Sequence, residues 1–573
     1  MSNTSTEPAS EFGEKVSAGC MPPWDVGELP EAPSLSWSFR GLVGPGLMMA
    51  GAAIGGGEWL MGPAVTAQYG GTVMWLAMVS IVLQVAYNLS VMRYTIFCGE
   101  PIVVGFMRLV PGPRLWVWVY LFLDFFAIWP YLSANAAVPL NAALLGHLPG
   151  ALPTTYLSVE EVAAQTGMST DMLKEIKDNP KRFVLDPKAN QERPPEELAQ
   201  WMERERARSR WFAYCIFLLA FVPLIFGGKI YNSLEKIMTA KILLVLGYLI
   251  FLGIFLVSWR TWLEVFAGFV FIGKGGDGTW GFRLLPDLPD GMKLDWALLA
   301  AFAAIAGNGG LTNSSFSNYV RDKGWGMGSL VGAIPSMFGG KTITLSHTGR
   351  VFRVSQTALQ RWKGWMRLLT RDQCMIWGVG CVLGMAIPSL VSLEFVRGQT
   401  VQGDAVAAAT AQGIMKATAE RGMPTAVSQT FWFLTLFCGF LVLAPSQVST
   451  IDGIIRRWTD VLWTGNPQLK KLEGHKVKYV YYSLNVAYAL FGLVVLVLIG
   501  NRLMVIVKGS TWLMNLGLGI SALHTLAVNM VFLPRELRPG WTLRIALVAC
   551  AIFFIGISLM GLTQVLRDFG IVK

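Results

Sequence analysis

Long runs of apolar residues, separated by shorter polar stretches, dominate the chain from residue 41 to residue 565. A helix needs about 20 apolar residues to cross a bilayer. Lipid offers the backbone no hydrogen-bond partners, so successive runs of this length favour helices over strands. The pattern predicts an all-α polytopic membrane protein with eleven transmembrane helices. They are expected at residues 41–68, 72–97, 115–146, 211–227, 237–258, 294–320, 373–393, 428–450, 479–500, 503–533 and 541–565.

Polar stretches divide this series of helices. Residues 153–210 carry ten basic and eleven acidic side chains, which excludes them from the membrane. We interpret them as a solvated insertion, with a role in gating substrate entry as the alternative, and expect short helices to begin near residues 170 and 194. The predicted organisation is a polar N-terminal tail (1–38), spans one to three (39–152), a hydrophilic extramembrane insertion (153–210) and spans four to eleven (211–573).

Basic residues in the loops predict the orientation. The loop at 321–372 has nine basic and two acidic residues, and the loop after the eighth span is also basic. Cytoplasmic loops carry such an excess, so we expect a cytoplasmic N-terminus and an outside C-terminus, in a plasma or bacterial inner membrane.

Within the loop, apolar and basic residues from 351 to 369 alternate with helical spacing. This pattern predicts a basic amphipathic helix lying on the inner leaflet, which we interpret as an anchor leading into the seventh span.

Composition narrows the class of protein. Of 573 residues, 53% are hydrophobic and 14% charged, whereas soluble domains have about 25% charged residues. The net charge of +11 resides largely in the loops between apolar runs, so we do not expect a nucleic-acid partner. Seven scattered cysteines without a Cys-x-x-Cys pair favour neither disulfides nor a thiolate metal site. No cleavable signal peptide is visible, and no nucleophile–base arrangement indicates an enzyme.

Two glycine-rich interruptions occur inside predicted helices one and six. Residues 52–58 read Ala-Ala-Ile-Gly-Gly-Gly-Glu, and residues 303–310 read Ala-Ala-Ile-Ala-Gly-Asn-Gly-Gly. Secondary transporters carry paired helix breaks at equivalent positions of two inverted repeats, with the binding site between them. Small residues also allow close helix packing, but a carboxylate in mid-span is costly and normally faces a cavity. The expected substrate-binding residues are Gly55, Gly56, Glu58, Ala306, Gly307, Asn308, Thr312 and Asn313.

These residues resemble a known family, the Nramp-type (natural resistance-associated macrophage protein) divalent metal-ion transporters, which have a LeuT-type fold. The likeness begins at Gly44-Pro45-Gly46 and continues through residues 67–70. Residues 447–453, Gln-Val-Ser-Thr-Ile-Asp-Gly, are similar to the family's Gln-x-Ser-Thr-Ile-x-Gly. The resemblance implies unwound spans one and six and an inverted repeat of spans 1–5 and 6–10.

The chain departs from the family at its metal ligands. Where the family has Asp-Pro-Gly-Asn, this chain has Gly55-Gly56-Gly57-Glu58, and the family's methionine position falls on Gly309. A histidine of the sixth span is replaced by Leu311, and two carboxylates of the third span by Tyr131 and Ala134. The resemblance therefore implies neither the sulfur ligand that favours softer metals nor the family's usual proton coupling.

The remaining candidate ligands are oxygen and amide groups. Glu58, Asn308, Thr312 and Asn313, with backbone carbonyls freed at the breaks, suit hard cations such as Mg²⁺, which keep several waters, or Mn²⁺. We expect a transporter of a divalent cation, with no permanently bound cofactor and with the lipid bilayer as its surroundings. A LeuT-type site also suits an amino acid or another small organic solute, and a non-transporting sensor or scaffold is the third hypothesis.

Four further polar residues of the predicted helices are candidates for an ion or proton path. They are Asp124 and Asn135 in the third span, Gln447 in the eighth and His524 in the tenth. For His524 the alternative is a hydrogen-bonded packing role. Asp452 also lies in a predicted span, but we expect it to pair with Arg456, one helical turn away.

Overall fold

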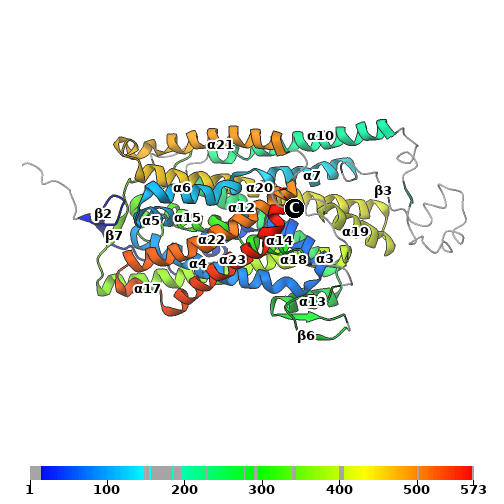
Figure 1. Cartoon of the computed structure of the whole chain (residues 1–573), viewed down its shortest axis with the longest axis horizontal. Helices are drawn as coiled ribbons and strands as arrows, with labels where there is room; N and C mark the ends of the chain where they lie inside the picture. Colours follow the sequence, from blue (N-terminus) through cyan, green and yellow to red (C-terminus); the bar gives the residue numbers. More distant parts are fainter. Residues whose placement is uncertain are drawn as a thin grey trace, which may run out of the picture.

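The computed structural model describes residues 15–147, 149, 154–155, 184–185, 195–226, 229–276, 278–288, 294–338, 343–398, 406–499, 503–568 and 570. Most of these residues are helical, and the long helices run side by side along the longest dimension of the molecule (Figure 1). The predicted all-α class is confirmed at this level.

Eight helices of the described part are long and apolar enough to cross a membrane. Each overlaps one of the predicted ranges. They are Gly71–Cys98, Gln200–Ile225, Ile230–Leu256, Gln356–Val396, Thr425–Gly465, Gly474–Leu498, Val507–Phe532 and Trp541–Arg567. The main helices within them are α4 (Trp75–Cys98), α10 (Pro195–Leu219), α12 (Ile230–Leu256), α18 (Gly378–Val396), α20 (Thr425–Gly465), α21 (Val477–Ile499), α22 (Leu503–Phe532) and α23 (Trp541–Asp568).

The other three predicted spans contain interrupted helices, so none of them is a single long helix. The first consists of α2 (Pro45–Ala53), a π-helical turn η1 (Gly57–Met61) and α3 (Gly62–Tyr69). The third and sixth are divided likewise. The third consists of α6 (Pro113–Asp124), η3 (Phe125–Ile128) and α7 (Tyr131–Leu145), and the sixth of α14 (Trp296–Ile305), η4 (Gly310–Ser314) and α15 (Ser315–Lys323).

The interrupted helices of the first and sixth spans lie inside the bundle. Residues 297–305 of α14 are all buried, and so are residues 57–67 of η1 and α3. Apolar side chains on every face of a helix are typical of a position surrounded by other helices. Here α3 and η1 pack on α18, α2 packs on α12, and α14 packs on α22 and α23. This arrangement places both helix breaks in the middle of the protein.

Helix α10 begins at Pro195, close to the predicted start near residue 194, and continues without a break through residue 210. It lies beside α21 at the upper edge of Figure 1. The insertion and the fourth span are therefore joined by one helix. The other short helix, predicted near residue 170, falls outside the described residues.

The N-terminal tail and the basic loop fold together at one end of the molecule. Strand β2 (Trp24–Gly27) pairs with β1 (Lys15–Val16) and, in parallel, with β7 (Arg350–Phe352). The predicted amphipathic helix is α17 (Gln356–Arg371), which begins later than expected because Ser355 caps it. Its position on the leaflet is corrected: the apolar face is buried against protein, where Trp365 Nε1 donates to the Pro30 carbonyl at 2.8 Å. The tail covers the face that the sequence alone assigned to lipid.

The remaining short elements connect these helices. They are α1 (Phe39–Leu42), η2 (Gly71–Met74), α5 (Ile102–Arg108), β3 (Thr154–Thr155), β4 (Val184–Leu185), α11 (Val222–Ile225), α13 (Trp259–Phe269), β5 (Ile272–Lys274), β6 (Trp280–Phe282), α16 (Gly328–Val331), η5 (Asp372–Trp377), α19 (Val406–Glu420), η6 (Leu469–Lys471), η7 (Gly474–Lys476) and η8 (Arg535–Leu537).

Candidate functional site

The first helix break separates α2 from η1 and approaches the second break closely. Helix α2 ends at Ala53, and the chain resumes as the π-turn that contains Glu58. A Cβ atom at Gly57 would lie 2.2 Å from the carbonyl oxygen of Ile305, the last residue of α14. Only glycine permits this approach, so the run of glycines brings the two breaks into contact.

The second break follows Ile305 and has a different backbone. Gly307, Gly309 and Gly310 have φ angles of 104°, 67° and 54°, in the region that side chains with a Cβ atom rarely adopt. The helix stops at Ala306 and resumes only at η4. Both interruptions predicted from the glycine runs are present.

The carboxylate of Glu58 joins the two breaks. One oxygen accepts a hydrogen bond from Gly55 N at 3.2 Å, and the other accepts one from Gly307 N, also at 3.2 Å. The side chain is fully buried. Because buried backbone amides need acceptors, Glu58 stabilises the unwound backbone on both sides.

Gln84 of α4 holds the second break from the opposite side and was missed in the sequence. Its Nε2 donates to the Ala306 carbonyl at 2.7 Å, and its Oε1 accepts from Gly309 N at 3.3 Å and from Asn313 Nδ2 at 2.8 Å. Gln84 is fully buried. The Ala306 carbonyl, at the second break, thus already accepts a hydrogen bond from Gln84, as buried backbone groups need partners. The only sequence signal was a polar amide within an apolar run.

The predicted ligand Asn308 is fixed by two hydrogen bonds. Its Oδ1 accepts from Trp377 Nε1 at 2.6 Å, and its Nδ2 donates to the Met49 carbonyl at 3.0 Å. Its side-chain oxygen would have to leave Trp377, or accept a second contact, before it could bind a cation.

A cavity of about 60 Å³ lies between the two breaks, enough for roughly four water molecules. Five predicted binding residues line it, whereas Glu58, Ala306 and Asn313 lie outside its lining. Serine, threonine, tyrosine and asparagine residues contribute to its lining, together with glycine and apolar residues. The lining residues are Ala52, Ala53, Gly55, Gly56, Gly57, Ala127, Tyr131, Leu132, Ile305, Gly307, Asn308, Thr312, Ser446, Ser449, Thr450 and Met514.

A buried lysine stands next to this site and was also missed. Lys241 of α12 is 3% exposed, and its Nζ donates to Ser446 Oγ at 2.5 Å. Ser446 Oγ lies 3.5 Å from the carbonyl oxygen of Ile54, next to Gly55, whose amide donates to Glu58, so both side chains meet the first break. A lysine within the predicted span 237–258 was a usable signal, because charged residues inside membrane helices are rare and functional.

Gly309 aligns with the methionine of the Nramp-type family, but the backbone here does not allow a methionine side chain at this position. A Cβ atom at Gly309 would lie 2.4 Å from the Ala304 carbonyl oxygen, and the φ of 67° disfavours any side chain. No group of three or more His, Cys, Asp or Glu side chains in the described part of the chain is arranged to hold a metal ion. A cation in this cavity would keep water in its coordination shell.

The four residues predicted to form a path do not line the cavity. Asp124 pairs with Arg457 at 2.9 Å, and Asn135 Nδ2 donates to the carbonyl of Tyr131 at 2.8 Å. Gln447 Oε1 accepts from the backbone of α7 at 3.2 Å. Asp124 lines a separate small cavity together with Tyr120, whose hydroxyl lies 2.7 Å from His524 Nδ1.

His524 lies in a stack of aromatic rings. Its Nδ1 is 2.7 Å from the hydroxyl of Tyr120, and its ring stacks 4.7 Å from the ring of Phe106. The surroundings match the packing alternative weighed for this residue.

A second group of buried charges connects α15 with α20, away from the cavity. Arg456 pairs with Asp452 at 2.7 Å, as expected from their spacing, and also with Asp322. Arg321 pairs with Asp460. These pairs hold the two helices together without lining the site.

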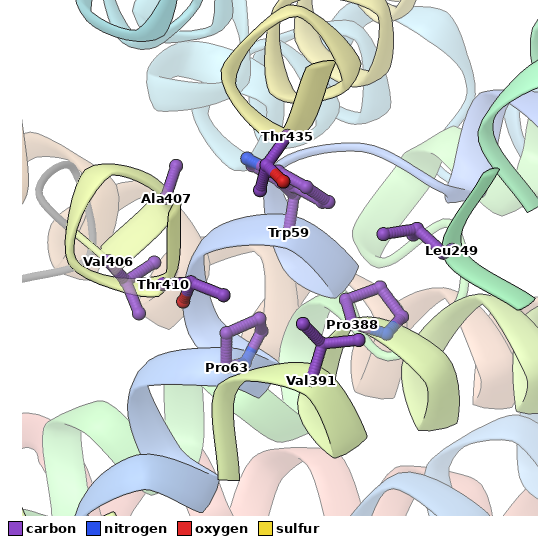
Figure 2. A pocket seen from close by; sticks show the side chains of 9 residues that line it. All are labelled: Trp59, Pro63, Leu249, Pro388, Val391, Val406, Ala407, Thr410 and Thr435. Atoms are coloured by element: carbon purple, nitrogen blue, oxygen red, sulfur yellow. The ribbon is translucent and has the colours of Figure 1, made fainter. Parts of the chain in front are cut away.

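A smaller cavity lies on the other side of η1 (Figure 2). It measures about 10 Å³ and is lined mainly by apolar side chains. Trp59 and Pro63 face it from the first span, and Thr410 from α19. Its size and lining suit at most one water molecule, so the larger, partly polar cavity is the better candidate site.

Comparison with known proteins agrees with this architecture at the level of the fold. No established protein-family profile matches the sequence. The chain is 29% identical over 131 residues to an uncharacterized protein of Pasteurella multocida (strain Pm70), a stretch that covers 22% of this chain and 28% of that protein.

Solved structures of the Eremococcus coleocola manganese transporter are similar over nearly the whole chain. A variant of it with one histidine replaced by alanine has a TM-score of 0.56 at 12% identity, covering 95% of this chain and 91% of that one. The same transporter in complex with an aromatic bis-isothiourea substituted compound has a TM-score of 0.52 at 13% identity, covering 98% and 92%. The chain therefore has the fold of a membrane transporter and is an integral, multi-pass membrane protein.

Proposed function

We propose that this protein moves a divalent cation, hard or partly hydrated such as Mg²⁺ or Mn²⁺, across the membrane by alternating access. The observation that carries the proposal is Glu58, a buried acidic side chain hydrogen-bonded to both helix breaks, beside a cavity with a partly polar lining. A mid-membrane carboxylate between two broken helices is typical of an ion-binding site in secondary transporters.

Three further features support a hydrated ion. The cavity has room for several waters, and serine, threonine and asparagine residues contribute to its lining. Gly309 itself cannot carry a sulfur ligand, although Met514 of α22 also lines the cavity. The structural relatives are named as manganese transporters, and Mn²⁺ accepts carboxylate, carbonyl and water ligands. In this mechanism Glu58 would exchange a backbone amide donor for the cation, with Thr312 and Asn308 as further oxygen ligands.

The proposal includes the finer architecture. Eleven spans, with spans 1–5 and 6–10 as inverted repeats, place the two breaks at equivalent positions. The basic loop at 321–372 favours a cytoplasmic N-terminus and an outside C-terminus. On this interpretation the first span corresponds to the metal-binding helix of the Nramp-type transporters, with its ligand motif replaced.

Uptake by the purified protein in liposomes tests the proposal. Glu58→Gln removes the charge with little change in volume, and we expect Mn²⁺ and Mg²⁺ uptake to fall by at least about tenfold because a cation loses its anionic ligand. Glu536→Gln changes an exposed carboxylate in η8 and serves as the control. Unchanged uptake in Glu58→Gln would contradict the proposal.

A small organic solute, such as an amino acid, is the second candidate. The observation in its favour is that the site has both an acidic and a basic side chain behind its wall, Glu58 at Gly55 and Lys241 at Ser446, which suits a zwitterionic molecule. Calorimetry with Mn²⁺, Mg²⁺ and a panel of amino acids separates the two candidates, because only the transported class should give saturable heat.

A further inference from the structure

An ammonium group lies behind the wall of the cavity. Lys241 donates to Ser446 Oγ at 2.5 Å, and Ser446 lines the cavity. The same hydroxyl lies 3.4 Å from the carbonyl oxygen of Ala52 and 3.5 Å from that of Ile54, at the end of α2. The positive charge of α12 is thus one hydrogen bond away from the space between the helix breaks.

The charges of the site cancel. None of the residues that line the cavity is charged. Directly behind them stand Glu58, which accepts a hydrogen bond from Gly55 N, and Lys241, which donates to Ser446 Oγ beside the Ile54 carbonyl. A divalent cation that enters the site therefore meets no net negative charge, and its attraction to the carboxylate is opposed by repulsion from the ammonium.

Neighbouring helices supply no other strong countercharge for Lys241 in the described part of the chain. Helix α2 has no titratable side chain, and α20 contributes Cys438. On α18, Cys381 interacts with Glu58. Helix α15 meets the other end of α12, where Lys323 pairs with Glu235 at 2.7 Å. Glu58 is therefore the carboxylate that balances Lys241.

We propose that Lys241 determines the specificity of the site as a built-in competitor for Glu58. The positive charge of Lys241 interacts with Glu58 when no substrate is present. It also repels an entering divalent cation, which keeps cation binding weak and reversible. A transported ion must leave as well as enter, so weak binding favours turnover. The inference rests on the proposed function and adds the residue that sets its affinity.

Neutral substitutions of Lys241 test this role in the full-length protein. Lys241→Gln keeps a donor for Ser446, and Lys241→Met removes it. We expect both variants to bind Mn²⁺ and Mg²⁺ at least about tenfold more tightly in calorimetry, because the repulsion is lost. Maximal uptake into liposomes should fall while the half-saturating concentration also falls, since release becomes slow.

Two controls keep charge and position separate. Lys241→Arg retains the positive charge and should bind the ions as weakly as the wild type. Lys236→Met changes an exposed lysine on the same helix and should alter neither affinity nor uptake. If Lys241→Met fails to fold, the ion affinity and uptake of Lys241→Gln test the inference, because glutamine retains the hydrogen bond to Ser446.

The outcomes distinguish the inference from the proposed function. If the wild type binds the ions and the folded Lys241→Gln variant binds them equally or more weakly, Lys241 is a structural anchor and the inference is overturned. If neither the wild type nor any neutral Lys241 variant binds Mn²⁺ or Mg²⁺, the proposed function fails, and the inference with it.

Discussion

The two helix breaks look alike in sequence but are held open in different ways. The first contains its own polar partner, because Glu58 accepts the amide of Gly55 only three residues away. In the second, the local contact is longer, from Asn313 Nδ2 to the Gly310 carbonyl at 3.5 Å. The backbone of the second break is held by Gln84 of α4 and by Glu58 of the first break. An unwound helix thus needs partners for its backbone, and these can come from the local sequence or only from the fold.

This contrast makes Glu58 the residue on which both breaks depend. Glu58→Gln should lower the stability by about 1–3 kcal/mol, the cost of leaving a buried polar group unsatisfied. The amide nitrogen of glutamine cannot accept a hydrogen bond, so either Gly55 N or Gly307 N would lose its acceptor. Thermal unfolding of the purified protein in detergent measures the effect.

A double variant sharpens this prediction. Glu58→Gln combined with Lys241→Met removes both charges, so its loss of stability should be smaller than the sum of the two single losses. Simple additivity of the three values would mean that Lys241 and Glu58 are independent, which would contradict the charge balance described above.

Gln84 contacts only the second break, so its replacement should disturb that break alone. Gln84→Leu leaves the Gly309 amide and the Asn313 side chain without this partner, and each such buried group costs about 1–3 kcal/mol. Gln360→Leu, at an exposed position of α17, is the control for the same substitution. Equal stability of the two variants would show that the second break does not need Gln84.

Gly309→Ala tests the backbone of the second break alone. The φ of 67° and the contact of a Cβ atom with the Ala304 carbonyl predict a loss of about 1–3 kcal/mol. Gly247→Ala is the matched control, because a Cβ atom there meets nothing within 4 Å in the middle of α12. It should be neutral or stabilise the protein by up to about 1 kcal/mol, and an equal loss in both variants would refute the strained backbone.

Particular residues show how far prediction from sequence reached. Glu58 and both glycine runs could be found because a carboxylate and several glycines stand out within apolar helices. Gln84 and Lys241 were equally visible as polar residues in predicted spans, but nothing in the sequence pointed them toward the breaks. The sequence did not show that the N-terminal tail covers the apolar face of α17. The two segments lie more than 300 residues apart in the chain.

Local patterns determined the helices and their interruptions, since apolar runs select membrane helices and glycine weakens a helix wherever it stands. Only the tertiary structure decided which groups meet at the interruptions. Glu58 is bonded to Gly307, and Lys241 to Ser446, across separations of 249 and 205 residues. Such pairings depend on the packing of whole helices rather than on neighbours in sequence. That packing places Glu58 and Lys241 beside the same cavity.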